Sequence, residues 1–269
     1  MPRIDQVLVT QNLAESRAHA QRLVSDGRVS WHNGRDWQTV KKASYELDDT
    51  TPLQVADSDT DKFVSRAGMK LAGALMHTQF SVTGLNVLDL GTSTGGFADC
   101  LLQNGAGRVI GVDVGHGQLH PRLQDEPRLT VFENCNARYL DAETLAERFA
   151  DLNDTSITPV THGFDLAVAD LSFISLTKVL PIFTASNDSL LKPNGHILML
   201  VKPQFELDAD ALSKAGIVKD SARYTEVQAN ILQACVMQDL TVLDYFASPI
   251  TGTDGNHEFF VFAQFQPNN

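Results

Sequence analysis

The stretch that decides the fold class is Asn86-Val87-Leu88-Asp89-Leu90-Gly91-Thr92-Ser93-Thr94-Gly95-Gly96-Phe97. Its first five residues form a short, mostly apolar run that is typical of a buried β-strand. A glycine-rich turn follows, and we expect a helix to begin near Phe97. Glycines allow the backbone to approach a ligand closely, and the N-terminus of a helix offers free N–H groups. The stretch therefore predicts a strand, a ligand-binding loop and a helix in succession.

From residue 63 onward, helical and strand patterns alternate along the chain. We expect a helix over 63–78 and strands at 86–90, 109–112, 130–134, 165–169, 195–201, 241–247 and 258–265. This alternation is typical of a mostly parallel, doubly wound sheet with helices on both faces. In such a sheet, ligands bind at the carboxyl ends of the strands. The fold class expected for residues 61–269 is therefore α/β and Rossmann-like.

The N-terminal segment predicts a small α+β domain that begins with a helix over 15–27. Ala20, Leu23 and Val24 share one face of this helix, and Gly27 is placed to end it in the left-handed conformation.

A β-hairpin is expected directly after this helix. Alternating stretches at 29–32 and 36–40 flank Asn33-Gly34, which favours a tight two-residue turn, and we expect Trp31 and Trp37 to pack in the hairpin core. The acidic stretch 46–61 is typical of a linker, so we place the small domain and this linker in residues 1–60.

Charge is distributed unevenly along a chain whose net charge is −12. Residues 1–45 contain seven Lys and Arg against four acids, a net charge of +3, which leaves −15 for the other 224 residues. We therefore expect a polyanion to bind first to the N-terminal segment.

Membrane and metal-binding classes find no support in the sequence. The longest aliphatic run, 197–201, is far shorter than the roughly 20 residues that span a bilayer. The N-terminus lacks the apolar core of a signal peptide, so we expect the protein to stay in the cytoplasm. Cys100, Cys135 and Cys235 form no Cys-x-x-Cys pair, and we expect buried free thiols and no metal site.

The ligand of the glycine-rich loop is indicated by two acids. Asp113 closes the next expected strand 24 residues after Asp89, at about the spacing at which an acid binds ribose hydroxyls in dinucleotide folds. The dinucleotide fingerprint needs three glycines spaced for a pyrophosphate, and this loop lacks that register. A carboxylate attracts the cationic amino-acid and sulfonium groups of S-adenosylmethionine, whereas it repels the negatively charged phosphates of a dinucleotide. We therefore expect S-adenosylmethionine rather than NAD.

The expected cofactor-binding residues are Asp89, Gly91, Thr92, Ser93, Gly95, Gly96, Phe97, Asp113 and Asn136. Asn136, which follows the third strand, could contact the adenine of the cofactor, and a turn-forming role is an equally good interpretation.

Motifs in both parts of the chain match known families. In the first part they are Arg3, Asp5, Ser16-Arg17, Gly27-Arg28-Val29 and Asn33-Gly34. In the second they are Val64-Ser65-Arg66-Ala67-Gly68-Met69-Lys70-Leu71, 89–97 with 99–102, 112–119, Asp170-Leu171-Ser172-Phe173-Ile174-Ser175, Val201-Lys202-Pro203-Gln204-Phe205-Glu206 and Gly255-Asn256-His257-Glu258. Residues 3–42 resemble the S4 RNA-binding domain, and residues 62–265 resemble the FtsJ-like ribose methyltransferases. The combination resembles the haemolysin A (TlyA) family of rRNA 2′-O-methyltransferases.

The resemblance implies a catalytic tetrad of Lys70, Asp170, Lys202 and Glu258. A ribose 2′-hydroxyl must lose its proton as its oxygen attacks the sulfonium methyl, and Lys202 is the expected base. Asp170 would orient Lys202, and Glu258 would orient Lys70. Each acid alone is also explained as a strand-end residue paired with a lysine.

The resemblance also implies ribosomal RNA or a ribosomal subunit as the partner, and cytidine as the modified nucleoside. The expected RNA-binding residues are Arg3, Arg17, Arg22, Arg28 and Arg66. The alternative for the first four is an ordinary solvated face. Ala67, where relatives often have glycine, and Trp37, where a smaller aliphatic residue is usual, depart from the family patterns.

Three other functions remain as alternatives. A membrane-active haemolysin would need an export signal, an apolar span or a cationic amphipathic helix, and the sequence contains none. A non-catalytic ribosome-assembly factor is disfavoured by the complete tetrad. A small-molecule O-methyltransferase is disfavoured by the basic N-terminal segment. The polar stretch 206–224 receives no role.

Overall fold

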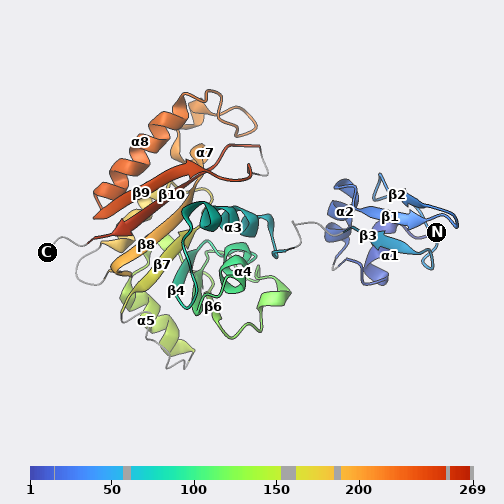
Figure 1. Ribbon diagram of the computed structural model, residues 1–269, viewed down its shortest axis with the longest axis horizontal. Coiled ribbons are helices and arrows are strands. Elements are labelled where there is room, and N and C mark those ends of the chain that lie inside the picture. The colour runs from blue at the N-terminus through green and yellow to red at the C-terminus, as the bar shows by residue number, and fades with distance from the viewer. Residues whose placement is uncertain (15, 57–61, 153–161, 185–188, 253–254, 267–269) are drawn as a thin grey trace. The chain divides into compact units, whose positions relative to one another are not determined.

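The computed structural model describes residues 1–14, 16–56, 62–152, 162–184, 189–252 and 255–266. The chain divides into two units, Met1–Lys62 and Phe63–Asn269, each with its own sheet and its own hydrophobic core (Figure 1). The domain boundary expected after residue 60 falls within 57–61, which lies outside the described residues.

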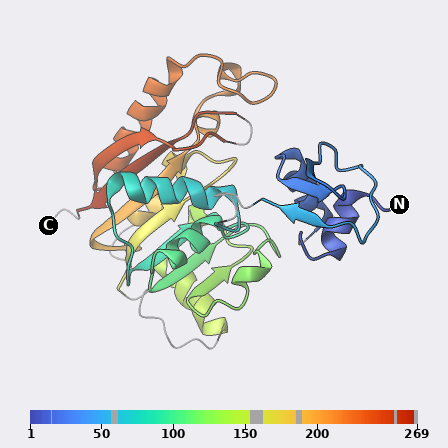
Figure 2. The ribbon, with the colours of Figure 1, turned by 45° about the vertical axis from the view of Figure 1, so that its right-hand side comes forward.

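The N-terminal unit combines two helices with a three-stranded antiparallel sheet (Figure 2). The helices are α1 (Ile4–Thr10) and α2 (Arg17–Ser25), and the strands lie in the order β2 (Trp37–Thr39), β1 (Val29–His32), β3 (Leu53–Val55). Ala20, Leu23 and Val24 of α2 are buried together, which confirms the expected apolar face. Gly27 follows the helix with a φ of +69°, as its position predicts.

Two elements of this unit go beyond the sequence-based expectation. α1 forms because Ile4 and Leu8, one turn apart, are both fully buried. β3 lies inside the stretch expected to be a linker and pairs antiparallel with β1, and Leu47 just before it is buried. The linker prediction is therefore wrong for residues 46–55, and residues 57–61 lie outside the described part of the chain.

The β1–β2 hairpin differs from its prediction in its turn and in one tryptophan. Four residues, 33–36, connect the strands, and only Gly34 takes a positive φ, +93°. The side-chain oxygen of Asn33 closes this loop by accepting from the backbone N–H groups of Arg35 and Asp36. Trp37 is 47% exposed, so its expected place in the core is wrong. The cause is that all three residues of β2 face solvent.

The second unit contains a seven-stranded sheet in the order β6-β5-β4-β7-β8-β10-β9. Its strands are β4 (Asn86–Leu90), β5 (Arg108–Val112), β6 (Leu129–Phe132), β7 (Phe164–Ala169), β8 (Leu191–Val201), β9 (Leu240–Ala247) and β10 (Phe259–Phe265). β4 to β8 are parallel, whereas β10 runs antiparallel between β8 and β9. The mostly parallel sheet expected from the sequence is confirmed. β6 ends two residues earlier than expected, shortly before Asn134 turns with a φ of +53°, and β8 begins four residues earlier.

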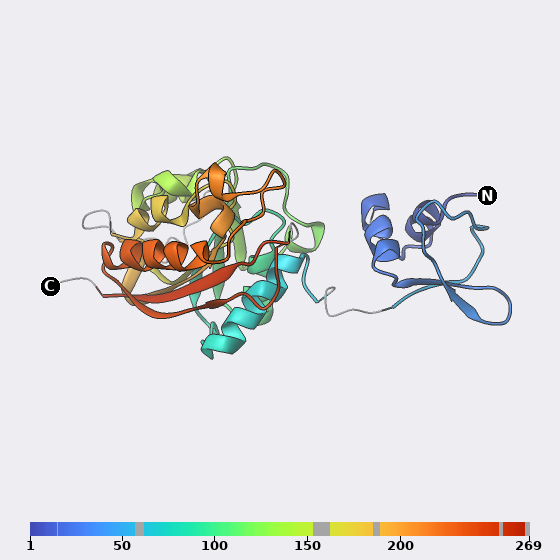
Figure 3. The same cartoon turned by 90° about the horizontal axis from the view of Figure 1, so that it is seen from above.

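Helices cover both faces of this sheet, because successive strand residues point to opposite sides. Val87 and Val109 pack with α3 (Arg66–Thr78) and α4 (Gly96–Gln103), whereas Leu88 and Ile110 pack with α5 (Ala142–Asp151) and α8 (Arg223–Val236). Figure 3 shows α3 and α8 on opposite sides of the strands.

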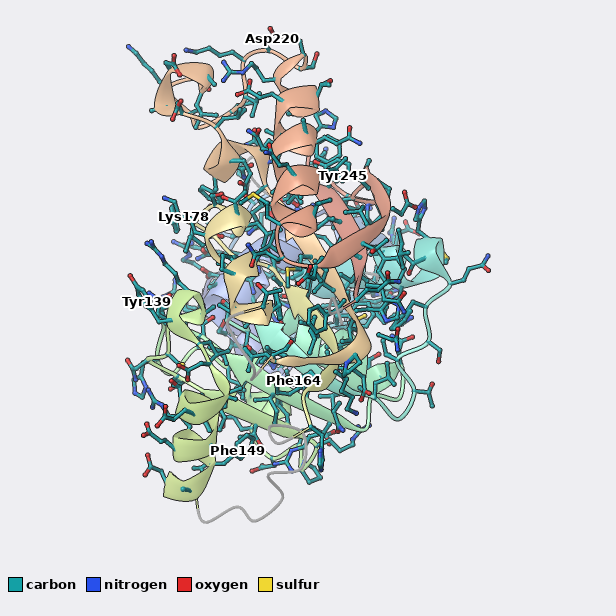
Figure 4. All side chains as sticks on the ribbon, turned by 90° about the vertical axis from the view of Figure 1, so that its left-hand side faces the viewer. Tyr139, Phe149, Phe164, Lys178, Asp220 and Tyr245 are labelled. Atoms are coloured by element: carbon teal, nitrogen blue, oxygen red, sulfur yellow. The ribbon has the colours of Figure 1, made fainter. Side chains whose placement is uncertain are left out.

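On the α5 side, Phe149 and Phe164 are fully buried, and both are labelled in Figure 4. Truncating either ring to alanine should lower the free energy of unfolding by about 3–5 kcal/mol.

The first helix of this unit starts later than expected, at Arg66 instead of residue 63. The residues before Arg66 are fixed by a hydrogen bond and not by helix formation. The backbone N–H of Val64 donates to the buried carboxylate of Asp99, on α4, at 2.7 Å. Small residues on both helices allow this approach. A Cβ atom added to Gly96 would collide with the hydroxyl of Ser65.

The three cysteines are free and buried, as expected. Among the described residues, none of the helices has the length and apolar composition needed to traverse a bilayer. In the same part of the chain, no three His, Cys, Asp or Glu side chains gather into a potential metal site.

Candidate active site

The loop between β4 and α4 has the backbone shape that its glycines predict. Gly91 and Gly95 take φ values of +82° and +91°, and Ser93 between them takes +48°. A Cβ atom on Gly91 would lie 2.9 Å from the carbonyl oxygen of Asp170, so glycine is required there both by conformation and by space. The loop therefore runs directly against the carboxyl end of β7.

Asp89, the fourth residue of β4, is fully buried beneath this loop. Within the described chain, neither of its carboxylate oxygens has a hydrogen-bond partner of normal geometry, although the Thr92 side chain and the backbone of Ala98 lie near enough to act against the rise of its pKa. Burial, together with the negative charge of Asp170, raises the pKa of Asp89 to about 7. A buried carboxylate without partners is unfavourable unless a cation or a donor satisfies it. The position therefore suits a positively charged ligand.

Asp113 follows β5 and ties two loops together through its carboxylate. One oxygen accepts from the backbone N–H of Ser93 at 2.8 Å, and the other accepts from that of Gly115 at 2.6 Å. Each carboxylate oxygen can accept a further hydrogen bond, so a ribose hydroxyl remains compatible with this arrangement. Thr92 is buried, and its hydroxyl donates to the carbonyl of Asp89. The expected acids and the loop therefore belong to one structure.

Three expected cofactor residues have contacts within the protein. Gly96 permits the packing of α4 on the start of α3, and Phe97 is buried and stacks on Phe260 with ring centroids 6.4 Å apart. Asn136 is exposed, and its side chain accepts from the backbone N–H of Arg138 to cap a 3-10 turn. The structure thus gives Asn136 the turn-forming contact that is the alternative to adenine binding.

Two lysine–acid pairs are formed by one residue of α3 and three residues at the ends of strands. Lys70 of α3 approaches Glu258, just before β10, at 2.5 Å. Lys202, after β8, approaches Asp170, after β7, at 2.6 Å and donates to the hydroxyl of Ser172 at 2.9 Å. The four charged side chains are between 3% and 15% exposed. The chain thus brings together all four residues of the expected tetrad, paired as expected.

The two pairs and the glycine-rich loop share one electrostatic environment. Burial raises the pKa of the Glu258 carboxyl, the charges of Lys70 and Lys202 lower it, and Asp170 raises it. Asp170 also raises the pKa of Asp89. Its backbone N–H donates to the carbonyl of Leu90 at 3.1 Å, which fixes the end of β7 beside the end of β4. Asp170 therefore belongs both to the tetrad and to the wall of the loop site.

Phe173 is an unexpected feature at this edge of the sheet. It is 90% exposed and takes a φ of +65°, a conformation that an aromatic residue rarely adopts. Its ring lies 5.2 Å from that of Phe205, and the amine of Lys202 lies 6.0 Å from the Phe205 ring. Strain at an exposed aromatic residue points to a functional role. The signal in the sequence is the one aromatic residue of the motif 170–175.

The N-terminal arginines differ in their surroundings. Arg3 and Arg17 both pair with Asp5, whose side chain is fully buried. Burial acts to raise the pKa of Asp5, but hydrogen bonds from Gln21, Arg17 and Arg3 outweigh it and hold that pKa below its ordinary value. These two arginines therefore stabilise the unit itself.

The other expected RNA-binding arginines have different contacts. Arg28 donates to the carbonyl of Ala56, at the end of β3. Arg22 on α2 and Arg66 at the start of α3 are exposed to solvent. Arg17 is exposed as well, but it is engaged by Asp5.

Comparison with protein families agrees with this division. Residues 63–265 match the model of the FtsJ-like methyltransferase family, and residues 2–50 match that of the S4 domain. A 16S/23S rRNA (cytidine-2′-O)-methyltransferase, TlyA of Mycobacterium tuberculosis, is 38% identical over 269 residues, with 98% of this chain and 90% of the relative covered. Hemolysin A of Brachyspira hyodysenteriae is 32% identical over 257 residues, with 96% and 97% covered.

Solved structures show the same architecture. A hemolysin-named protein from Streptococcus thermophilus is similar over 99% of this chain and 89% of its own, with 32% identity and a TM-score of 0.72. A second hemolysin-named protein, from Lactococcus lactis, covers 76% of this chain and 88% of its own, with 33% identity and a TM-score of 0.65. The similarity to FtsJ-like methyltransferases covers the second unit, whereas the similarity to the proteins from Mycobacterium tuberculosis, Brachyspira hyodysenteriae and Streptococcus thermophilus extends across both units.

Proposed function

The chain belongs to the S4-containing TlyA branch of the FtsJ-like methyltransferases, and from this membership we propose that it methylates a ribose 2′-hydroxyl of ribosomal RNA. The observation that carries the proposal is the convergence of two lysine–acid pairs beside a buried, unpartnered acid at the glycine-rich loop. The name of the mycobacterial relative supports cytidine as the nucleoside. A ribosomal substrate also implies that the protein works in the cytoplasm.

The cofactor we propose is S-adenosylmethionine, which would supply an electrophilic methyl group on a positively charged sulfur. The loop residues 91–95 would enclose it, Asp113 would accept from its ribose hydroxyls, and Asp89 would compensate its positive charge. The fit rests on Asp89, because a cation gives this buried carboxylate the partner that the protein does not. A dinucleotide would instead place a pyrophosphate near an acid, which is unfavourable.

In the proposed reaction, Lys202 takes the proton from the 2′-hydroxyl. The proton passes to Nζ in the unprotonated amine, and the ribose oxygen gains the electron pair with which it attacks. Asp170 and Ser172 hold the Lys202 amine from two sides, at 2.6 and 2.9 Å. Lys70 supplies a fixed positive charge that favours the developing oxyanion, and Glu258 holds Lys70 in place.

The target nucleotide needs a surface for its base as well as for its ribose. Phe173 offers an exposed ring next to the Lys202 segment, and unstacked bases bind to aromatic side chains in this way. We propose that the S4 unit supplies general RNA affinity through residues that include the exposed Arg22 of α2, and that Arg66 contacts RNA near the catalytic pairs.

The proposed function is tested by transferring labelled methyl groups to ribosomal RNA that lacks this modification. The RNA is then digested to nucleosides and analysed by mass spectrometry. We expect a ribose-methylated nucleoside, cytidine, that depends on both the protein and S-adenosylmethionine. A methyl group on a base, or no transfer to either ribosomal subunit or to its RNA, would contradict the proposal.

A further inference from the structure

The loop after β7 carries several groups of the candidate site and is fixed at both ends. It contains Asp170, Ser172 and Phe173, and its first residue is tied to β4 by the hydrogen bond to the Leu90 carbonyl. A loop with a strained residue such as Phe173, at φ +65°, needs further contacts to hold its shape. The contacts at its far end come from one carboxylate.

That carboxylate belongs to Glu206. One oxygen accepts from the hydroxyl of Ser175 at 2.6 Å, and the other accepts from the backbone N–H of Leu176 at 2.7 Å. Ser175 caps the short 3-10 helix Leu176–Lys178, so the carboxylate binds at the start of that turn. Charge-assisted hydrogen bonds of this length are among the stronger ones in proteins.

Glu206 also has a fixed relation to Lys202. Lys202 is the N-cap of α7 (Pro203–Glu206), a single turn that Glu206 ends. The segment 202–206 and the loop 170–176 therefore meet at three places. Lys202 contacts Asp170 and Ser172, the Phe205 ring lies tilted beside that of Phe173, and Glu206 binds Ser175 and Leu176.

Glu206 has no part in the proposed chemistry, although it is an acid close to a catalytic centre. Burial raises the pKa of its carboxyl, while the hydrogen bonds from Ser175 and Leu176 and the charge of Lys178 lower it. Its two hydrogen bonds come from Ser175 and Leu176, at the end of the loop. Glu206 connects the segment 202–206 to the loop 170–176, and it lies one helical turn after Lys202, the proposed base.

We infer that Glu206 is a positioning residue: by binding Ser175 and Leu176, it holds the 170–176 loop so that Asp170 and Ser172 orient Lys202 for proton removal. The inference rests on the proposed ribose methylation. It assigns to Glu206 an effect on the rate of transfer, and it predicts that S-adenosylmethionine binding does not depend on this residue.

The first test compares Glu206→Ala with Glu206→Gln in single-turnover methyl transfer by the full chain, at saturating RNA and S-adenosylmethionine. Glu206→Ala should lower the rate roughly 10- to 100-fold, the scale expected when a reacting group is misplaced by about 1 Å. Glu206→Gln should stay within a few-fold of wild type, with an unchanged pH profile. Its carbonyl can accept from Leu176, and its amide can donate to the Ser175 hydroxyl.

The matched control is Asp165→Ala. Asp165, at the opposite end of β7, also accepts from one backbone N–H, that of Asn86, and from one side chain, that of Lys192. Its loss should lower the melting temperature without slowing transfer. Ser175→Ala removes one Glu206 hydrogen bond with little disturbance, and it keeps the test decisive if Glu206→Ala fails to fold. It should give an intermediate reduction in rate.

A double-mutant cycle separates positioning from a general loss of stability. If Glu206 acts through the contact of Ser172 with Lys202, Glu206→Ala should cost several-fold less in a Ser172→Ala background than in wild type. The inference is overturned if the rate reductions of Glu206→Ala and Ser172→Ala multiply fully in the double variant. It is also overturned if Glu206→Ala transfers methyl at the wild-type rate, or if Glu206→Gln slows transfer as much as Glu206→Ala does. If the wild-type protein itself transfers no methyl group to ribose, the proposed function fails instead.

Discussion

At the residue scale, the pKa of about 7 at Asp89 makes cofactor affinity depend on pH. Only the ionised carboxylate attracts a cation, and its population rises from about one tenth at pH 6 to about nine tenths at pH 8. The affinity for S-adenosylmethionine should therefore rise up to about 10-fold over this range. Calorimetry on wild type and Asp89→Asn checks this, and the variant should bind more weakly with a flat profile. Equal slopes in both proteins would refute the assignment.

The same raised pKa affects the stability of the ligand-free protein. Burial disfavours the charged form of Asp89, so wild type should lose stability as pH rises from about 4 to about 7, with no further loss above. Asp89→Asn has no charge to bury at any pH. Between pH 4 and pH 8, the difference in unfolding free energy should shift in favour of the variant by up to about 4 kcal/mol. Urea denaturation at the two pH values measures this shift.

The tetrad gives a prediction that separates an enzyme from an RNA-binding scaffold. Lys202→Ala should abolish transfer, and in wild type the rate should rise with pH because only the neutral amine accepts a proton. Asp170→Asn keeps the shape but removes the charge, and it should lower turnover roughly 100-fold or more. S-adenosylmethionine affinity should change only a few-fold in Asp170→Asn. It should change toward tighter binding, because Asp170 raises the pKa of Asp89. Single-turnover assays and calorimetry test both variants, and a near-normal rate in Lys202→Ala would exclude the proposed base.

At the scale of elements, Asn256 lies in the connection between β9 and β10 and binds a turn in the stretch 206–224. It is 1% exposed, and its side chain accepts from Val218 N–H at 3.1 Å and donates to the Gly216 carbonyl at 3.0 Å. Asn256→Ala should release this turn, so backbone amides over 213–219 should exchange hydrogen faster by roughly 10-fold or more. Amides of β4 and β5 should exchange as in wild type. Uniformly faster exchange would indicate a global loss of stability instead.

The central strands β4, β5 and β7 were the part of the fold most readily predicted from the sequence, because each is a short apolar run buried on both faces. The unit that carries α1 and β3 was harder to predict. β3 has only three residues, none of them fully buried, and it follows an acidic stretch that is also typical of a linker. The prediction of a two-residue hairpin turn was wrong because the Asn33 side chain closes a longer loop.

The candidate site was predictable where chemistry dictates the residue type, as in the tetrad and Asp89. Contacts made by tertiary packing could not be read from spacing. Gly96 looks like a ligand-binding glycine, yet it also serves the packing of two helices. Arg3 and Arg17 look like an RNA-binding pair, yet both surround the buried Asp5. Nothing in the sequence indicates the role of Glu206, because its partner Ser175 lies 31 positions away and only the fold brings the two together.

At the scale of the whole molecule, we propose that the two units divide labour. The second unit, 63–269, should bind S-adenosylmethionine with unchanged affinity when it is produced alone, because the glycine-rich loop, Asp113 and both ion pairs lie within it. It should bind ribosomal RNA much more weakly than the full chain, because it lacks the basic residues of the segment 1–45. Calorimetry and filter binding measure the two affinities, and RNA affinity equal to that of the full chain would refute the division.

Charge reversal on α2 tests the same division in the intact protein. Arg22 is the suitable position because its side chain is exposed, whereas reversing Arg17 would also expose the charge of Asp5 to repulsion and disturb the fold. Arg22→Glu should weaken RNA binding and lower the slope of log affinity against log salt by about 0.7–0.9 for each phosphate that the protein no longer neutralises. Asp26→Lys, on the residue that ends the same helix, is the reciprocal control and should strengthen binding. If both substitutions leave the salt slope unchanged while transfer continues, α2 does not face the RNA, and the phosphate-binding residues must lie elsewhere in the protein.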